Sequence, residues 1–202
     1  MPKIITLAHQ KGGVGKSTLA LNLAYVFNSS LNVGLLDADL QGSLSSLPLM
    51  ADGITIISLP KDMEELRKLE FDVIIIDTPP YLSNNLPKLF NVSDFILVPT
   101  KAGFLDVMAI QSTIALIQQA KKANPCLKAG IVFNMIQSRY STVCQVKKML
   151  KDSAVPLLTS FISQRVSYVR SVITSGIINS NDEKAKEEIL ALAEEILEKL
   201  GL

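Results

Sequence analysis

Apolar residues gather along the chain in short runs of Val, Ile and Leu, and segments with helical spacing separate these runs. Several runs are almost continuous in apolar residues, as is typical of strands that are buried on both faces. Seven of them predict strands, at residues 3–9, 32–38, 53–59, 72–77, 94–100, 129–134 and 155–162. Apolar positions three and four residues apart predict helices at 16–28, 61–69, 104–123, 140–151, 164–174 and 182–200.

The regular alternation of strand and helix predicts βαβ units, and therefore an α/β fold with a mainly parallel central sheet flanked by helices. The last helix follows "SNDEKAKEEI", with Ser180 or Asn181 expected as its N-cap. The length of 202 residues suits a single domain spanning 1–202. No repeat, low-complexity linker or domain boundary interrupts the pattern.

The composition excludes several classes of protein. No apolar run approaches the roughly 18 residues that a membrane span needs. The N-terminus "MPKIITLAHQ" lacks the length and cleavage site of a signal peptide, so we expect a cytoplasmic protein. Cys126 and Cys144 form no CxxC pair and His9 is the single histidine, which argues against a disulfide framework and against a zinc site.

The net charge of +1 hides a strong asymmetry along the chain. Residues 121–170 carry nine Lys and Arg against Asp152 alone, whereas the flanking segments are acidic. Such a basic block is a candidate surface for a polyanion, although a solvated helix face would have the same composition. Helical spacing places three of its lysines on one side of a predicted helix, namely Lys147, Lys148 and Lys151.

A glycine-rich loop carries the strongest chemical signal. The stretch "GGVGKST" at 12–18 follows a predicted strand and opens a predicted helix, which is the setting of a Walker A phosphate loop. Its glycines let backbone N–H groups face phosphates, aided by the positive end of the helix. We expect Lys16 to reach the β- and γ-phosphates, Ser17 to ligate Mg²⁺ and Thr18 to contact the α-phosphate. The remaining loop contacts would come from Gly12, Gly13, Val14 and Gly15.

Three aspartates stand at the ends of predicted strands. Asp77 ends the buried run "FDVIIIDTPP", where an ionised carboxylate is costly unless it meets a cation or hydrogen-bond donors. It is therefore the candidate Walker B ligand of magnesium. Asp37 and Asp39 lie two residues apart in "GLLDADLQGS", so both would point to the same face if the strand continued. One could orient the attacking water while the other supports Mg²⁺ or Lys16.

Taken together, "KGGVGKST", "DADLQG" and "DVIIIDTPP" resemble the ParA branch of the ParA/MinD family, the deviant Walker A ATPases of the SIMIBI class. The resemblance spans essentially the whole chain, through "GFLDVMAI", "FNMI" and "QRVSYVRSVITSG". It implies a three-layer P-loop NTPase fold with ATP and Mg²⁺ as cofactors. In that family the residue matching Lys11 crosses a dimer interface and contacts the ATP of the other subunit, so the resemblance implies an ATP-sandwich homodimer.

The resemblance also assigns roles to single residues. Asp39 matches the catalytic position that orients water, and Asp37 would assist at the metal. Asn134 in "IVFNMI" matches the position that reads the adenine edge. The family often has proline after the second aspartate, whereas this chain has Leu40, which bears on the role of Gln41.

The resemblance further implies nonspecific DNA binding by the ATP-bound dimer, through the neighbourhood of Arg165 and Arg170. Because the loop starts at residue 11, we expect no N-terminal helix-turn-helix extension, and a ParB-like or ParG-like centromere-binding adaptor would supply the cargo. The expected function is DNA partition by a cytoplasmic, nucleoid-associated ATPase. Rival functions are positioning of a protein cargo on the nucleoid, membrane cycling of the MinD type, and a small-molecule P-loop kinase. The glutamate-rich helix at 182–200 argues against a membrane partner.

Overall fold

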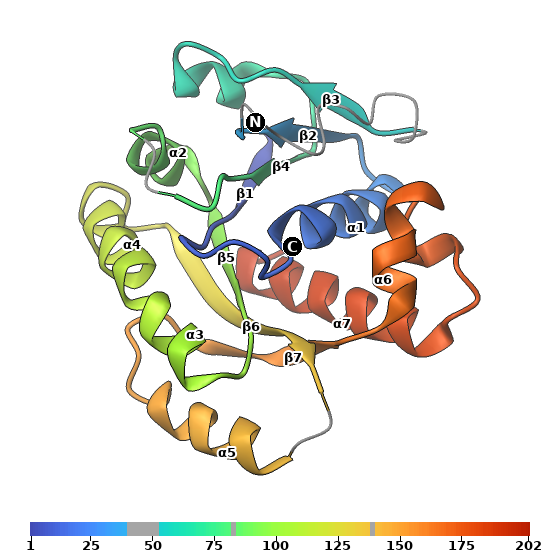
Figure 1. The fold of residues 1–202 in the computed structure, drawn as a ribbon. Helices are drawn as coiled ribbons and strands as arrows, with labels where there is room; N and C mark the ends of the chain where they lie inside the picture. The colour runs from blue at the N-terminus through green and yellow to red at the C-terminus, as the bar shows by residue number, and fades with distance from the viewer. Residues whose placement is uncertain (40–52, 82–83, 138–139) are drawn as a thin grey trace.

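The computed structural model describes residues 1–39, 53–81, 84–137 and 140–202. Within these residues a single parallel sheet of seven strands forms the middle of three layers (Figure 1). The sheet order is β3-β2-β4-β1-β5-β6-β7. The strands are β1 Lys3–Leu7, β2 Val33–Asp37, β3 Thr55–Ile57, β4 Val73–Asp77, β5 Phe95–Thr100, β6 Lys128–Ile136 and β7 Leu157–Ser163. All seven predicted strands are confirmed, and every described pairing is parallel.

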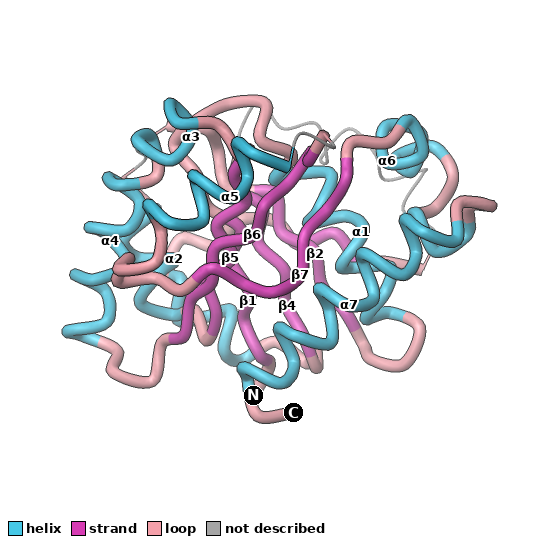
Figure 2. Tube along the Cα trace, turned by 90° about the horizontal axis from the view of Figure 1, so that it is seen from below, coloured by secondary structure: helices cyan, strands magenta, loops and turns pink. Residues whose placement is uncertain are grey.

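Helices cover both faces of the sheet, as Figure 2 shows. One face is covered by α1 Lys16–Asn28 and α7 Glu183–Leu200, with the short α6 Val166–Arg170 beside them. The other face is covered by α2 Leu86–Val92, α3 Phe104–Ala109, α4 Gln111–Ala123 and α5 Tyr140–Met149. The central strands are therefore buried on both sides, which explains their continuous apolar runs.

Several helices differ from their predicted bounds. The segment 104–123 is divided at Ile110 into α3 and α4. The segment 61–69 forms only a 3₁₀ helix, Met63–Lys68, and 164–174 is α6 followed by the 3₁₀ turn Ser171–Ile173.

Helix α2 was not predicted; Pro87 lies in its first turn, where proline is well tolerated. At α7, Asp182 is the N-cap that accepts a hydrogen bond from the Ala185 N–H, so the expected caps Ser180 and Asn181 were wrong.

The strand register brings the predicted site residues together at the carboxyl ends of the strands. Leu7 pairs with Asp77, and Asp37 pairs with Asp77 from the other side. The carboxyl ends of β1, β2 and β4 therefore finish at the same level. Strand β1 also borders β5, so the chain crosses from one half of the sheet to the other beside the phosphate loop. Ligands of parallel α/β folds bind at such a switch point.

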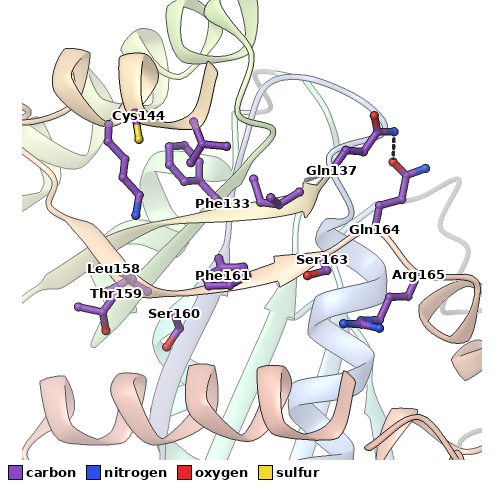
Figure 3. Close-up of a pocket in the computed structure, with 13 residues that line it drawn as sticks. Phe133, Gln137, Cys144, Leu158, Thr159, Ser160, Phe161, Ser163, Gln164 and Arg165 are labelled. Atoms are coloured by element: carbon purple, nitrogen blue, oxygen red, sulfur yellow. Dashed lines mark hydrogen bonds between the residues drawn. The ribbon is translucent and has the colours of Figure 1, made fainter. Parts of the chain in front are cut away.

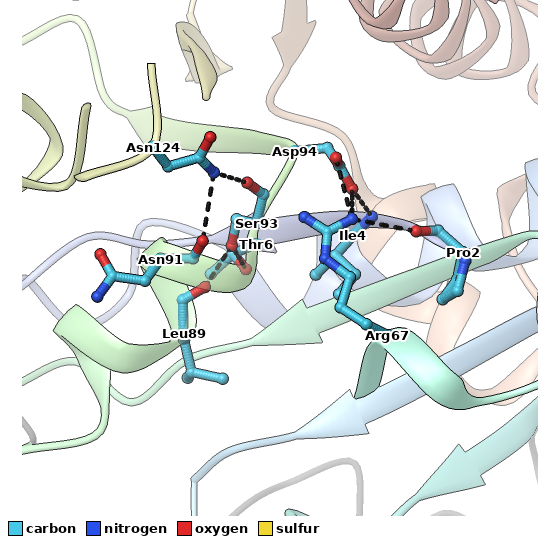
Figure 4. A network of polar contacts seen from close by, with 9 residues as sticks. All are labelled: Pro2, Ile4, Thr6, Arg67, Leu89, Asn91, Ser93, Asp94 and Asn124. Carbon is cyan, nitrogen blue, oxygen red and sulfur yellow. Dashed lines mark hydrogen bonds and ion pairs between the residues drawn. The ribbon is translucent and has the colours of Figure 1, made fainter. Parts of the chain in front are cut away.

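A polar network lies at the opposite, amino ends of the strands (Figure 4). Arg67 Nη1 donates to both carboxylate oxygens of Asp94, at 3.1 and 2.8 Å. Asp94 Oδ2 also accepts from the Ile4 N–H at 2.8 Å. Nearby, Asn124 Nδ2 donates to the carbonyls of Asn91 and Ser93. These contacts hold the starts of β1 and β5 in register and leave the carboxyl ends available for a ligand.

Candidate nucleotide-binding site

The glycine-rich loop links β1 to α1 and has the backbone of a phosphate loop. Gly13 and Gly15 have φ values of 69° and 87°, in the left-handed region that favours glycine. A Cβ atom at Gly15 would collide with the side-chain amide of Asn134, so only glycine fits there. Lys16 is the first residue of α1, at the positive end of the helix dipole. The loop residues Gly12, Gly13, Val14, Gly15, Lys16, Ser17 and Thr18 thus occupy the predicted context.

A buried carboxylate lies beside this loop. Asp77 is 2% exposed at the end of β4, and burial raises its pKa to about 7 although a hydrogen bond with Ser17 and the charge of Lys16 oppose the rise. Its Oδ1 atom has no hydrogen-bond partner among the described residues. Burial likewise lowers the pKa of Lys16, against the opposing charges of Asp77 and Asp39. Lys16, Ser17 and the three predicted aspartates therefore come together.

This cluster fits a magnesium ion that arrives with a nucleotide. An orphaned buried carboxylate oxygen beside a serine hydroxyl is the hard-oxygen chemistry that Mg²⁺ prefers. The described residues contain no ready-made group of three or more His, Cys, Asp or Glu that could hold a metal alone. Mg²⁺ typically keeps waters and phosphate oxygens as ligands, so few protein ligands are needed. Ser17 and Asp77 are the best placed, with Asp37 next to them in the register.

The geometry of the acidic pair differs from the expected one. Strand β2 ends at Asp37, and the backbone N–H of Asp39 donates to Asp37 Oδ1 at 3.0 Å. This Asx-type turn takes the chain off the strand, so the idea of two carboxylates on a continuing strand was wrong. Asp39 nevertheless stays close enough to affect both Lys16 and Asp77 electrostatically. Leu40 and Gln41 lie outside the described residues.

Lys11 is held by the chain's own α3. Its Nζ atom lies 2.5 Å from Asp106 Oδ1, with the two side chains 44% and 13% exposed. The neighbouring Gln10 Oε1 accepts a hydrogen bond from Ser112 Oγ at 2.9 Å. The front of the loop is therefore anchored to the start of α4 as well as to α3. Sequence reasoning missed Asp106 and Ser112, because only the fold brings segments about a hundred residues apart into contact.

Asn134, on β6, forms a hydrogen bond with the phosphate loop. Its side chain is 4% exposed, Nδ2 donates to the Val14 carbonyl at 2.7 Å, and Oδ1 accepts from the Met135 N–H at 2.9 Å. Both polar groups of the amide are thus engaged within the chain. The adenine-reading role that the resemblance implies for Asn134 stays a prediction, and the brace on the loop is a second role that the sequence did not suggest.

His9 lies just ahead of the loop, in the core. Its side chain is buried, and Nδ1 forms a hydrogen bond with the Pro99 carbonyl at 2.8 Å. Burial lowers the pKa of His9, so the imidazole is neutral near pH 7. It contributes no charge to the phosphate site.

The fold separates the five predicted DNA contacts of the basic block into two groups. Lys147, Lys148 and Lys151 are exposed at the end of α5, toward the start of β7. Arg165 and Arg170 follow the carboxyl end of β7, at the opposite end of that strand. Arg165 is already paired with Glu188 at 3.2 Å and Asp182 at 3.6 Å, whereas Arg170 is exposed. The block is therefore not one continuous patch.

A cavity of about 660 Å³ lies between α5 and β7, at the edge strand of the sheet (Figure 3). Its walls include Phe133 and Phe161, with Lys147 and Arg165 among the polar lining. No residue of the phosphate loop lines it. This cavity is therefore separate from the predicted nucleotide site.

Known proteins are similar to this chain over most of its length. A family model described as "CobQ/CobB/MinD/ParA nucleotide binding domain" matches residues 5–175. "Maintenance of carboxysome distribution protein A" of Halothiobacillus neapolitanus is 29% identical, with 96% of this chain and 95% of that protein covered. "Chromosome-partitioning ATPase Soj" of Thermus thermophilus is 27% identical, covering 73% of this chain and 75% of that protein.

Solved structures agree on the fold. A putative plasmid partition protein from Borrelia burgdorferi bound to AMPPNP superposes with a TM-score of 0.80 at 23% identity, covering 98% of this chain and 100% of that one. No helix in the described part of the chain is long and apolar enough to cross a membrane. The phosphate loop, the buried Asp77 and the parallel sheet lead to one conclusion: this chain belongs to the CobQ/CobB/MinD/ParA nucleotide-binding family and has the P-loop fold of its ParA/MinD-type ATPases.

Proposed function

We propose that this chain is a ParA-like ATPase that binds Mg-ATP, dimerises around it and partitions DNA. The observation that carries the proposal is the pair of lysines on one loop, of which Lys16 is buried among carboxylates and Lys11 is exposed. The first suits a phosphate bound by its own chain. The second is accessible to a nucleotide held by another copy.

Within one chain, the loop backbone and Lys16 would hold the β- and γ-phosphates. Ser17, Asp77 and Asp37 would hold Mg²⁺, which neutralises phosphate charge when bound. Asp39 would orient a water for attack on the γ-phosphate, because it follows the strand end two residues beyond Asp37 and its charge acts on both Lys16 and Asp77. Thr18 and Asn134 would complete the nucleotide contacts.

Lys11 would make the dimer depend on the γ-phosphate. To reach a partner's nucleotide, its ammonium group must leave Asp106. The triphosphate offers a stronger charge-assisted contact than a single carboxylate, so the exchange is favourable only while the γ-phosphate is present. Hydrolysis then loosens the dimer and resets the cycle.

The dimer would bind DNA of the nucleoid without sequence preference. Exposed lysines and arginines suffice for phosphate contacts, and two copies joined by ATP would gain from bivalency. The candidate contacts are Lys147, Lys148, Lys151, Arg165 and Arg170, with Arg165 weakened by its pairing to Glu188 and Asp182. A ParB-like or ParG-like adaptor would stimulate hydrolysis.

Lys11→Ala tests the proposal. The variant should still bind ATP through Lys16 but remain monomeric in light scattering with Mg²⁺ and AMPPNP, whereas the wild type should double in mass. Lys88→Ala, which removes an exposed lysine on α2, is the matched control and should dimerise normally. Nucleotide-dependent dimerisation of Lys11→Ala at the wild-type level would refute the sandwich.

A second candidate function is positioning of a protein assembly, favoured by the 29% identity to the carboxysome distribution protein over nearly the full chain. Both functions use the same ATP and DNA cycle, so they differ only in cargo. Deletion of the gene decides between them. Loss of plasmid or chromosome from dividing cells supports partition, whereas normal inheritance with misplaced protein clusters supports positioning.

A further inference from the structure

The cavity between α5 and β7 has the size and the lining of a site for a small molecule. Its volume is about 660 Å³, and sites for small molecules typically measure roughly 300–1,000 Å³. Two aromatic side chains line it, Phe133 on β6 and Phe161 on β7 (Figure 3). They are register partners on neighbouring strands. Phe133 is 2% exposed and Phe161 is 48% exposed, so the apolar lining reaches from the core to the surface.

The polar part of the lining carries positive charge. Lys147 on α5 and Arg165 after β7 both line the cavity. The guanidinium group of Arg165 is already paired with Glu188 and Asp182. Lys147, in contrast, forms no ion pair with any residue that the structure describes. An apolar lining beside one uncompensated cation is complementary to a ligand that has an apolar body and a negative charge.

The edge of β7 is closed to an added peptide strand over much of its length. As the last strand of the sheet, β7 would ordinarily present unpaired N–H groups. However, the N–H groups of Thr159 and Ser160 donate to the two carboxylate oxygens of Glu195, both at 2.9 Å. The Ser163 N–H donates to Glu188 at 3.0 Å. Because α7 takes up these donors, the cavity must recognise its occupant through side chains rather than through strand pairing.

We propose that this cavity binds a small organic carboxylate with an apolar body, of the chemical class of a medium-chain fatty acid. The chain would contact Phe133 and Phe161, and the carboxylate would lie at Lys147. Contact with the apolar lining supplies most of the affinity, and the accessible lysine adds preference for an anion. The inference goes beyond the proposed function and does not depend on it, because no residue of the phosphate loop lines the cavity.

The two cysteines of the chain allow a direct test with decanoate as the probe. Cys126 and Cys144 are both exposed thiols, but only Cys144 lines the cavity. In nucleotide-free protein, decanoate at about ten times its dissociation constant should slow alkylation of Cys144 by iodoacetamide about ten-fold, as measured by mass spectrometry. Alkylation of Cys126 is the internal control and should keep its rate.

Substitutions in the lining should weaken decanoate binding in isothermal titration calorimetry. Phe161→Ala removes part of the apolar lining and should raise the dissociation constant at least about ten-fold. Phe104→Ala is the matched control, because Phe104 is 49% exposed but lies on α3. Lys147→Ala should raise the dissociation constant about three- to ten-fold, whereas Lys148→Ala, which removes the next lysine of α5 outside the lining, should leave it unchanged.

Each result decides for or against the site. Saturable binding that protects Cys144 and weakens in Phe161→Ala and Lys147→Ala supports the proposal. Absence of saturable binding, or equal protection of both cysteines, overturns it. Wild-type affinity in Lys147→Ala overturns the anionic class of ligand. If vesicles of anionic phospholipid protect Cys144 and free decanoate does not, the surface binds a membrane and the small-molecule site is refuted. None of these results bears on ATP binding or dimerisation, which the Lys11→Ala experiment tests separately.

Discussion

Replacing Asn134 by alanine should weaken the binding of every nucleotide, because this side chain braces the phosphate loop. The Asn134 amide donates to the Val14 carbonyl at 2.7 Å and accepts from the Met135 N–H at 2.9 Å. Asn134→Ala removes both contacts and leaves backbone groups without partners in a buried place. Each orphaned group costs about 1–3 kcal/mol.

The loss should act on the loop rather than on the whole fold. Without these contacts, the loop can leave the conformation in which its N–H groups face the phosphates. The apparent dissociation constant for the nucleotide then equals the intrinsic one divided by the fraction of molecules whose loop is in the binding conformation. A brace worth about 2 kcal/mol sets that rise at about 30-fold. Titration with fluorescent analogues of ATP and GTP measures it, alongside urea unfolding for the global free energy.

The choice of nucleotide separates two interpretations of Asn134. A brace predicts the same loss for ATP and GTP, whereas an adenine-reading residue predicts that ATP loses more and that discrimination between the bases disappears. Asn124→Ala is the matched control, because the Asn124 amide also contacts two backbone groups, here the carbonyls of Asn91 and Ser93, but at the opposite end of the strands. It should reduce the free energy of unfolding and leave nucleotide affinity unchanged. Wild-type affinity in Asn134→Ala would refute the brace.

Two further changes test the electrostatics of the fold. Burial raises the pKa of Asp77 from 3.8 to about 7, so the folded chain binds this proton more tightly than the unfolded chain does. The protonated carboxyl therefore contributes to the free energy of unfolding. That contribution is complete below pH 3.8 and is lost as the pH rises through about 7. In magnesium-free buffer, Asp77→Asn should match the wild type near pH 4 and exceed its free energy of unfolding by up to about 4 kcal/mol at pH 8; a difference independent of pH would contradict this. Asp94→Asn weakens the contacts with Arg67 and the Ile4 N–H. The substitution should lower the free energy of unfolding in urea by about 1–3 kcal/mol without changing nucleotide affinity. An unchanged free energy of unfolding would show that the network does not stabilise the fold.

The sequence predicts the sheet well because its central strands are buried. Strands β1, β2, β4, β5 and β6 are mostly apolar, and burial on both faces removes the ambiguity of an alternating pattern. The edge strands β3 and β7 are partly exposed. Helix α1 is also predicted to the residue, because Gly15 and Lys16 fix its start. The sequence predicts the other helices less well, because Ile110 divides a continuous helical pattern and the short helix α2, with Pro87 in its first turn, was not predicted.

The sequence predicts those parts of the phosphate site whose residues lie close together along the chain. The loop at 12–18 and Asp77 at a strand end follow from patterns within ten residues. Contacts across the fold are not predictable in this way. The partner of Lys11 is 95 residues away, the brace from Asn134 to Val14 spans 120, and the basic block is divided because its members stand at opposite ends of β7.

The two lysines of the loop differ in how readily they can change partner. Lys16 is 6% exposed and balanced by Asp77 and Asp39, so removing it from its carboxylates and phosphates would leave buried charges uncompensated at a cost of several kcal/mol. Lys11 is 44% exposed, and an accessible ion pair such as its contact with Asp106 contributes only about 0–1 kcal/mol. A change of partner is therefore cheap for Lys11 and costly for Lys16. The proposed nucleotide-timed contact between two copies would use one lysine of each kind on the same loop.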